Sequence, residues 1–302
     1  MIKRMIILLL VLQAGAMLAL AAGAHVWWHC AWPASLALGF AVVLLVRAGI
    51  SANNFLMSRR AGSVTPAAHA LDPARALGLF LHEFLSSMLT SSWYMLHPIG
   101  LRLQPQARGL PVLLIHGYAC NSGYWLPMSK SLTRARISHY GIDLEPPGAA
   151  IDDFVPQVHA AVERLCAETG SAQVVVVGHS MGGLVARAYL RRHGHDRVAR
   201  VLTLGTPHYG TALAHFGPGC NAVQMRRGSE WLNLLDASEA DLQRTLFISI
   251  YSVHDNIVAP QDSSALPGAR NLVFGAIGHV ALGRHPEIMR AALQEIEAAA
   301  RR

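Results

Sequence analysis

The segment that most constrains the fold is VVVVGHSMGGLVARAYL, residues 174–190. Four consecutive valines favour a buried β-strand, because β-branched side chains suit the pleated surface of a sheet. The apolar pattern then changes, within a few residues, to one with helical spacing. Glycines flank the turn, so Ser180 lies where a strand passes directly into a helix. The segment predicts a sharp strand–turn–helix with a serine at the end of the strand.

The alternation of strand and helix extends from residue 110 to the end of the 302-residue chain. We expect strands at 111–115, 138–144, 172–178, 198–205, 244–252 and 269–277, with helices at 152–169, 181–192 and 286–302. Near-continuous apolar strands separated by helices are typical of a parallel sheet covered on both faces. The sequence therefore predicts an α/β domain over residues 109–302.

Ser180 is the candidate nucleophile. The run Gly178 to Gly182 is a GxSxG between a predicted strand and a predicted helix, the context in which this short motif is informative. A serine at such a turn has a strained backbone, so its neighbours must be small. The following helix N-terminus points N–H groups at the place where an oxyanion forms. We assign one oxyanion donor to the Met181 N–H; the simpler alternative is a serine in a tight turn.

A catalytic serine needs a base, and the base needs an acid that orients it. When the chain order is serine, acid, histidine, the base follows the last strand and the acid follows an earlier one. His279 lies in a short loop after the last predicted strand, and Asp255 follows the strand before it. We assign these two roles to His279 and Asp255, with His285 and Asp262 as the alternatives.

The second oxyanion donor is expected in the loop after the first predicted strand. His116, Gly117 and Tyr118 follow that strand directly. Gly117 permits close approach of the backbone, because glycine carries no side chain. We assign the donor to the backbone N–H of Tyr118; alternatively, the Tyr118 side chain shapes an acyl pocket.

These motifs resemble the α/β-hydrolase superfamily and, within it, the bacterial lipases and esterases. The segments that carry the resemblance are VLLIHGYACNSGYW, VVVVGHSMGGLVARAYL, VLTLGTPHYGTALA, SVHDNIVAP and GAIGHVAL, spread over residues 110–285. The TPHxG pattern in GTPHYGT, residues 205–211, is typical of lipases and of related phospholipases and deacylases. The resemblance implies a catalytic triad of Ser180, Asp255 and His279.

The resemblance also implies what surrounds the acyl site. The substrate-pocket candidates are His116, Gly117, His179, Thr206 and His208. Residues 211–242 would form a cap or lid, with a fixed helix pair on the sheet as the alternative. Secreted bacterial lipases of this type usually carry acidic calcium ligands near the catalytic histidine, whereas here no acid follows His279 until Glu287. We expect neither a metal nor a cofactor.

Residues 1–60 are expected to anchor the chain in a membrane. No Asp, Glu, Lys or Arg occurs from Met5 to Trp28 or from Ala31 to Val46, and three tryptophans stand between or beside these stretches. The first stretch is long enough to cross a bilayer, and the second is expected to end as a helix near Ile50. We predict a helical hairpin; a single anchor and a cleaved signal peptide are the alternatives.

The distribution of charged residues indicates on which side of the membrane the catalytic domain lies and which partners the chain binds. Basic residues flank the hairpin and its turn has no Lys or Arg, which places the catalytic domain in the cytoplasm, beside a bacterial inner membrane. A cleaved signal would instead give a periplasmic or secreted domain. The net charge of +7 comes from scattered arginines, so we expect membrane lipids rather than nucleic acid as a partner. No specific protein partner can be inferred.

Residues 61–108 connect the two parts. An amphipathic helix is expected from Pro73, with Asp72 as its N-cap. Its apolar side chains are Leu77, Phe80, Leu81, Phe84, Leu85, Met88 and Leu89. We expect this face to pack on the domain; the alternative is that it lies in the membrane interface.

The sequence thus predicts a membrane-anchored serine hydrolase that cleaves carboxylic esters, and lipid acyl esters are its expected substrates. Two alternatives use the same fold. One is an acyltransferase that uses the same triad, and the other is a non-catalytic module that binds a lipid or a partner.

Overall fold

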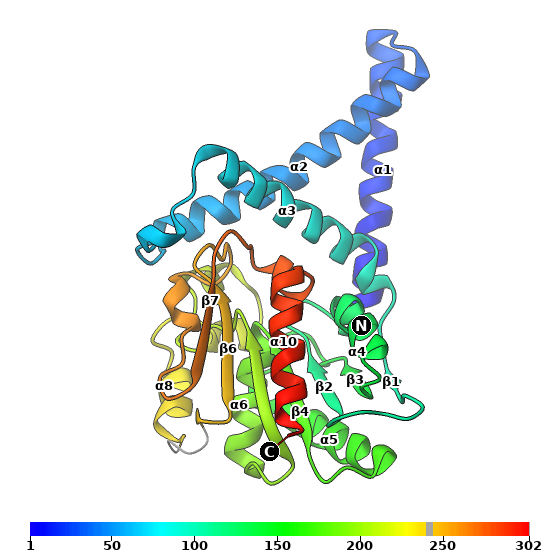
Figure 1. Cartoon of the computed structure of the whole chain (residues 1–302). Coiled ribbons are helices and arrows are strands. Elements are labelled where there is room, and N and C mark those ends of the chain that lie inside the picture. The colour runs from blue at the N-terminus through cyan, green and yellow to red at the C-terminus, as the bar shows by residue number, and fades with distance from the viewer. Residues whose placement is uncertain (240–243, 302) are drawn as a thin grey trace.

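The computed structural model describes residues 1–239 and 244–301 (Figure 1). One sheet forms the centre of the molecule, in the strand order β1-β3-β2-β4-β5-β6-β7. Its strands are β1 (Leu101–Arg102), β2 (Val112–Ile115), β3 (His139–Ile142), β4 (Val174–His179), β5 (Val198–Leu204), β6 (Phe247–Ser252) and β7 (Arg270–Phe274). Only the edge strand β1 is antiparallel, and it pairs with β3. The predicted parallel sheet is confirmed.

Helices cover both faces of the sheet. On one face lie α5 (Val155–Thr169), α6 (Met181–His193) and α8 (Glu230–Ala237), and on the other lie α4 (Leu126–Arg134) and α10 (Pro286–Ala299). The other short elements are α7 (Cys220–Gln224) and the 3₁₀ turns η1 (Ala67–His69), η2 (Tyr94–Leu96), η3 (Ser122–Trp125), η4 (Ile151–Phe154), η5 (Ala212–Phe216), η6 (Gln261–Ser264) and η7 (Val280–Gly283). The expected covering on both faces is present.

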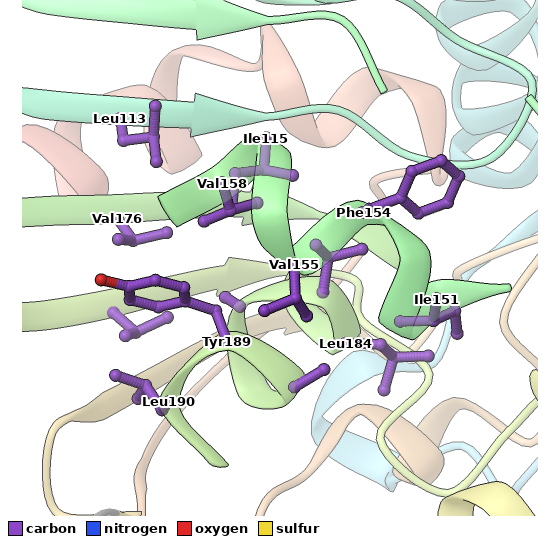
Figure 2. Packing of buried hydrophobic residues seen from close by; sticks show 14 of the residues in the cluster. Leu113, Ile115, Ile151, Phe154, Val155, Val158, Val176, Leu184, Tyr189 and Leu190 are labelled. Carbon is purple, nitrogen blue, oxygen red and sulfur yellow. The ribbon is translucent and has the colours of Figure 1, made fainter. Parts of the chain in front are cut away.

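The sheet has one hydrophobic core on each face, and the alternating direction of the side chains along its strands explains this arrangement. Successive side chains of a strand point to opposite faces. Val174 and Val176 of β4 therefore pack with the helices of one face, and Val175 and Val177 pack with those of the other. Figure 2 shows the first core, where Val155, Val158 and Leu184 from α5 and α6 pack against Leu113, Ile115 and Val176 from the sheet.

The N-terminal segment forms two long helices, α1 (Ile2–Trp28) and α2 (Trp32–Arg60), which run antiparallel and project from the domain as a hairpin (Figure 1). Both are long and apolar enough to cross a membrane, and most of their side chains are exposed. A membrane association or a signal sequence would each account for such helices. The expectation that the second helix ends near Ile50 is wrong, because it continues for ten further residues.

The base of the hairpin contacts the rest of the chain. Ile2 and Ile6 of α1 are buried against Met95. Arg47, in the middle of α2, donates hydrogen bonds to Gln13 of α1 at 3.2 Å and to the Ser92 hydroxyl at 3.0 Å. The arginine therefore joins the two hairpin helices to the end of the next helix.

Helix α3 (Pro73–Ser92) lies between the hairpin and the sheet, and the predicted cap is present because Asp72 accepts a hydrogen bond from the Arg75 N–H at 2.8 Å. Its orientation differs from the expectation. Leu77, Leu81, Leu85 and Leu89 are exposed, whereas Leu79, Glu83, Ser86 and Thr90 are buried. The prediction that the apolar face packs on the domain is wrong for these four leucines, because the domain surface under α3 binds polar side chains.

Candidate active site

Ser180 occupies the sharp turn between β4 and α6. Its backbone has φ 53° and ψ −123°, a left-handed conformation that a residue with a side chain adopts only under constraint. The flanking glycines make the turn feasible. A Cβ on Gly178 would lie 2.6 Å from the Gly183 nitrogen, and one on Gly182 would lie 2.2 Å from the Ile115 oxygen. The GxSxG pattern is therefore required by backbone packing at this turn.

Asp255 and His279 form a buried pair. The His279 Nδ1–H donates to Asp255 Oδ2 at 2.7 Å. The other carboxylate oxygen of Asp255 accepts the N–H groups of Ile257 and Val258, each at 2.8 Å. The backbone N–H of His279 donates to Asn256 Oδ1 at 2.9 Å. These contacts fix the ring orientation and use Nδ1, so Nε2 is the ring nitrogen that the hydrogen bond to Asp255 leaves available.

The surroundings of His279 raise its pKa despite its burial. Burial lowers the pKa of this histidine, but the negative charge of Asp255, their hydrogen bond and the charge of Glu83 outweigh it, so the pKa is raised. A base with a raised pKa accepts a proton more readily, and the imidazolium that forms is stabilised by the same carboxylates.

The alternative acid and base lie elsewhere. Asp262 is exposed in η6, where its N–H donates to the Ser63 hydroxyl. His285 caps the N-terminus of α10 by accepting the Glu287 N–H. Neither residue belongs to the pair beside Ser180.

The predicted oxyanion donors lie next to the nucleophile. A Cβ on Gly117 would be 2.9 Å from the Ser180 Cβ, so the loop after β2 packs directly against the serine. Within residues 1–239 and 244–301, the backbone N–H of Tyr118 has no hydrogen-bond partner. Met181 is the first residue of α6, whose N-terminal N–H groups point away from the helix body. The oxyanion role of both groups stays a prediction.

A cavity of about 620 Å³ opens beside Ser180. Its lining includes Tyr118, Leu213, Ala214, Phe216 and Met225, from the loop after β2 and from the segment around η5 and α7. Most of the exposed wall is carbon, which suits an acyl chain. Helix α2 supplies another wall through Asn53, Asn54 and Met57. Sequence reasoning missed that wall because it ended the helix before these residues.

The five pocket candidates lie behind the serine, and the cavity takes its lining from other residues. His116 accepts the Leu144 N–H on Nε2 at 3.0 Å and donates from Nδ1 to the Gly117 carbonyl at 2.9 Å. This histidine ties the oxyanion loop to the end of β3. Gly117 itself serves as the point of close approach to Ser180 rather than as pocket lining.

His179 is also structural. Its ring stacks on Tyr124 with centroids 4.2 Å apart, and its Nε2–H donates to the His279 carbonyl at 3.1 Å. Burial, together with the nearby His279, lowers its pKa well below the usual value. A neutral His179 therefore supports the segment that carries His279.

Thr206 and His208 are fully buried beneath the site. Thr206 packs against Gly183, where an added Cβ would lie 2.0 Å from its Oγ1. His208 hydrogen bonds through Nε2 with the Thr203 hydroxyl at 3.2 Å. The TPHxG segment thus packs against α6, and two residues of GTPHYGT, Pro207 and Thr211, reach the cavity.

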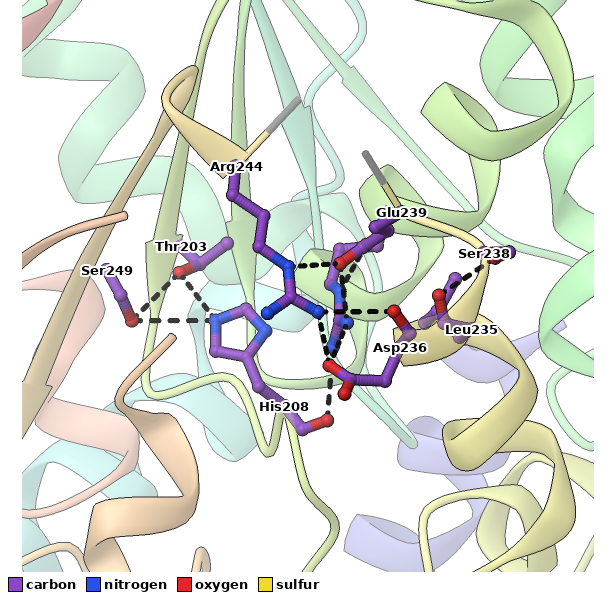
Figure 3. Close-up of polar contacts among 9 residues, drawn as sticks. Thr203, His208, Leu235, Asp236, Ser238, Glu239, Arg244 and Ser249 are labelled. Carbon is purple, nitrogen blue, oxygen red and sulfur yellow. Dashed lines mark hydrogen bonds and ion pairs between the residues drawn. The ribbon is translucent and has the colours of Figure 1, made fainter. Parts of the chain in front are cut away.

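A partly buried ion-pair network lies beside His208 (Figure 3). Arg187 of α6 is fully buried and pairs with Glu239 at 2.6 Å, while one of its nitrogens donates to the His208 carbonyl at 3.1 Å. Arg244 pairs with Asp236 at 2.5 Å and with Glu239 at 3.2 Å. The network joins the nucleophile helix to the end of α8, so removal of one partner would leave a buried charge uncompensated.

The expected cap at 211–242 divides into two parts. Its first half, with η5 and α7, lines the cavity. Its second half contains α8, whose Leu232 and Leu235 are buried in the domain core. Residues 240–242 of the expected cap lie outside the described residues. The first half thus forms a wall of the cavity and the second half packs against the sheet domain, while the role of the segment as a cap or lid stays a prediction.

Comparisons with known proteins agree with this geometry. A family model described as a PGAP1-like alpha/beta domain matches residues 148–277. The chain is 34% identical over 178 residues to a triacylglycerol lipase of Pseudarthrobacter phenanthrenivorans, covering 54% of this chain and 50% of that protein. It is also 34% identical over 178 residues to a triacylglycerol lipase of Burkholderia plantarii, covering 54% of this chain and 44% of that protein. The chain thus spans about half the length of the curated relatives it matches.

Structural similarity extends over the sheet domain. The Bacillus licheniformis lipase BlEst2 in its mature form superposes with a TM-score of 0.56 at 19% identity, covering 62% of this chain and 92% of the lipase. This similarity shows the fold. The chain has the α/β-hydrolase fold and is similar in sequence to triacylglycerol lipases over about half of its length, and the resemblance inferred from its motifs is confirmed.

Proposed function

We propose that this α/β-hydrolase-fold protein is a serine hydrolase that cleaves carboxylic esters, with Ser180, His279 and Asp255 as its triad. One observation carries the proposal: the strained Ser180 turn lies at the same sheet edge as a buried, hydrogen-bonded Asp255–His279 pair. The similarity to triacylglycerol lipases supports the same chemistry.

The proposed reaction is an acyl transfer through a covalent intermediate. His279 Nε2 removes the Ser180 hydroxyl proton as the oxygen attacks the ester carbonyl, and the N–H groups of Tyr118 and Met181 stabilise the oxyanion. Collapse of the tetrahedral intermediate breaks the bond to the alcohol oxygen, which takes the proton from His279. Water then attacks the acyl-enzyme with His279 as base and releases the acid. Asp255 stays ionised and stabilises the imidazolium.

Lipid acyl esters are the substrates that the cavity favours. The space beside Ser180 is walled mainly by apolar groups, and one wall belongs to α2, the second helix of the apolar hairpin. An acyl chain held there would lie next to a helix that can extend into a bilayer. The substrate could therefore pass from the membrane to Ser180 with little exposure to water.

Membrane lipids are the proposed surroundings of α1, α2 and the outer face of α3. Leu77, Leu81, Leu85 and Leu89 recur every fourth residue and form an exposed stripe that we call the leucine stripe. Trp93 continues it and is also exposed. Such a stripe on a helix beside two apolar helices suits the interface of a bilayer. The basic residues flanking the hairpin favour a cytoplasmic catalytic domain.

Turnover of lipid esters by the full chain in detergent or nanodiscs tests the proposal. We expect hydrolysis of acylglycerols or phospholipids by the wild type, with Ser180→Ala reduced to background. Added alcohols would reveal acyl transfer as new esters. Hydrolysis that persists at the wild-type rate in Ser180→Ala would overturn the assignment of the nucleophile.

The orientation can be tested with the exposed thiol of Cys220. A membrane-impermeant maleimide should label this cysteine only after the cells are lysed, and Cys220→Ser identifies the signal. Labelling in cells whose outer barrier alone is permeabilised would place the domain on the opposite side of the membrane.

A further inference from the structure

Helix α3 buries a carboxylate beside the catalytic histidine. Glu83 lies in the middle of that helix and is 1% exposed. Its Oε1 accepts the N–H of Val280 at 2.9 Å, and its Oε2 accepts the N–H of Ala281 at 3.0 Å. These are the two residues that directly follow His279 in the chain. One side chain therefore holds both backbone donors next to the proposed base.

The contact between Glu83 and the histidine segment is tight. A Cβ on Gly278 would lie 2.5 Å from the Glu83 carboxyl group, so the glycine just before His279 makes room for it. Among the described residues, no Lys or Arg forms an ion pair with Glu83. Burying a carboxylate without a cation is unfavourable unless hydrogen bonds compensate. The two N–H donors offset part of that cost.

Three separate contacts hold the backbone around His279. Asn256 accepts the His279 N–H, His179 donates to the His279 carbonyl, and Glu83 accepts the next two N–H groups. The first two contacts come from the α/β domain itself. The third comes from α3, which carries the leucine stripe on its opposite side.

We propose that Glu83 is a positioning residue for His279, holding the histidine segment in its productive place and stabilising the imidazolium that forms during catalysis. This inference rests on the proposed hydrolase function. If Glu83 has this role, the reaction depends on the packing of α3 against the sheet domain. The exposed side of α3 then faces lipid through the leucine stripe, while its buried side supports His279 through Glu83.

The groups that face Glu83 define how its charge acts. They are His279 in the loop after β7, Asp255 in the loop after β6, and Tyr124 of η3. Burial raises the pKa of Glu83 to about 7, although the two N–H bonds and His279 oppose this effect. When ionised, Glu83 in turn raises the pKa of His279. Its protonated form has one hydroxyl and cannot accept both N–H groups equally well.

Glu83→Gln is the direct test, because it keeps the size of the side chain and removes the charge. We expect kcat for a soluble ester to fall by about tenfold or more, with KM changed less than about twofold, since a displaced base slows chemistry and not binding. The acid limb of the pH–rate profile should move to lower pH, because His279 loses one source of its raised pKa. Ser86→Ala, on the same buried face of α3, is the matched control and should retain the wild-type kcat.

A second variant covers the case in which Glu83→Gln does not fold. Gly278→Ala leaves Glu83 intact but places a Cβ against its carboxyl group, and kcat should again fall by about tenfold. A folded Glu83→Gln enzyme with wild-type kcat and an unshifted acid limb would overturn the proposal. Wild-type kcat in Gly278→Ala would overturn it as well.

Proton NMR of the His279 Nδ1–H separates this inference from the proposed function. If the wild type hydrolyses no ester, the proposed function fails, but the titration of His279 can still be followed. Glu83→Gln should then lower the pH at which this resonance titrates. An unchanged titration would overturn the role of Glu83.

Discussion

The sheet domain and the N-terminal helices use leucine in opposite ways. In the domain, Leu113 and Leu114 of β2 are 0% exposed, whereas Leu77 and Leu85 of α3 are 58% and 56% exposed. The buried side of α3 carries one leucine, Leu79, together with Glu83 and the small polar residues Ser86 and Thr90. The hydrophobic effect explains the buried leucines of the sheet domain, because apolar surface is removed from water when the chain folds. The second arrangement suits the lipid surroundings that we propose for α3, so the comparison supports the proposal that one chain is folded for two surroundings.

The largest expected loss of activity comes from a substitution in the buried Asp255–His279 pair of the sheet domain. Asp255→Asn should reduce kcat by roughly 10⁴-fold, because the amide orients the wrong tautomer of His279 and cannot stabilise its charge. The measurement is ester hydrolysis, with circular dichroism to verify folding. A folded variant with a loss below about tenfold would remove Asp255 from the triad.

Much of this domain could be predicted from the sequence. Runs of β-branched residues mark strands regardless of their partners, and the order serine, acid, histidine fixes where Ser180, Asp255 and His279 lie along a parallel sheet. The two-residue strand β1 is too short to show a pattern. The pocket residues were missed for another reason: a conspicuous motif such as TPHxG shows which residues matter, but not whether they touch a ligand or support the turn beside it.

The N-terminal helices could be predicted less well. Helical spacing shows which residues of α3 share a face, but it cannot show whether that face meets protein, water or lipid. The apolar pattern of α2 ends at Asn53 and Asn54, but the helix continues. The sequence therefore did not predict that α2 lines the cavity. Glu83 is 197 residues from the Val280 N–H that it binds, and no local pattern reports such a contact.

A pair of equal substitutions tests the comparison itself. Leu202→Ala, at a fully buried position of β5, should lower the free energy of unfolding by about 2–5 kcal/mol. Leu81→Ala, in the leucine stripe, should change it in detergent by less than about 0.5 kcal/mol, because this side chain is 47% exposed and belongs to neither core of the sheet. Denaturant unfolding measures both. An equal loss in the two variants would mean that the stripe packs against protein.

A third prediction concerns the buried side of α3. The pKa of Glu83 is raised by burial from 4.5 to about 7, so the folded protein binds a proton that the unfolded chain has released. This contribution to stability is present below pH 4.5 and is lost as the pH rises through about 7, by about 3 kcal/mol in total.

Glu83→Gln lacks that titration and provides the control. Its stability relative to the wild type should therefore increase between pH 5 and pH 8, even as its activity falls. Parallel stability curves for the two proteins over this range would show that Glu83 titrates at its ordinary pKa.

The most direct test of the account is covalent labelling of the full chain with a fluorophosphonate, followed by peptide mass spectrometry. The account predicts one adduct, on Ser180, that forms in the wild type, disappears in Ser180→Ala and forms much more slowly in Asp255→Asn. An adduct on another residue, or a folded wild-type protein that forms none, would contradict the assignment of Ser180 as the nucleophile.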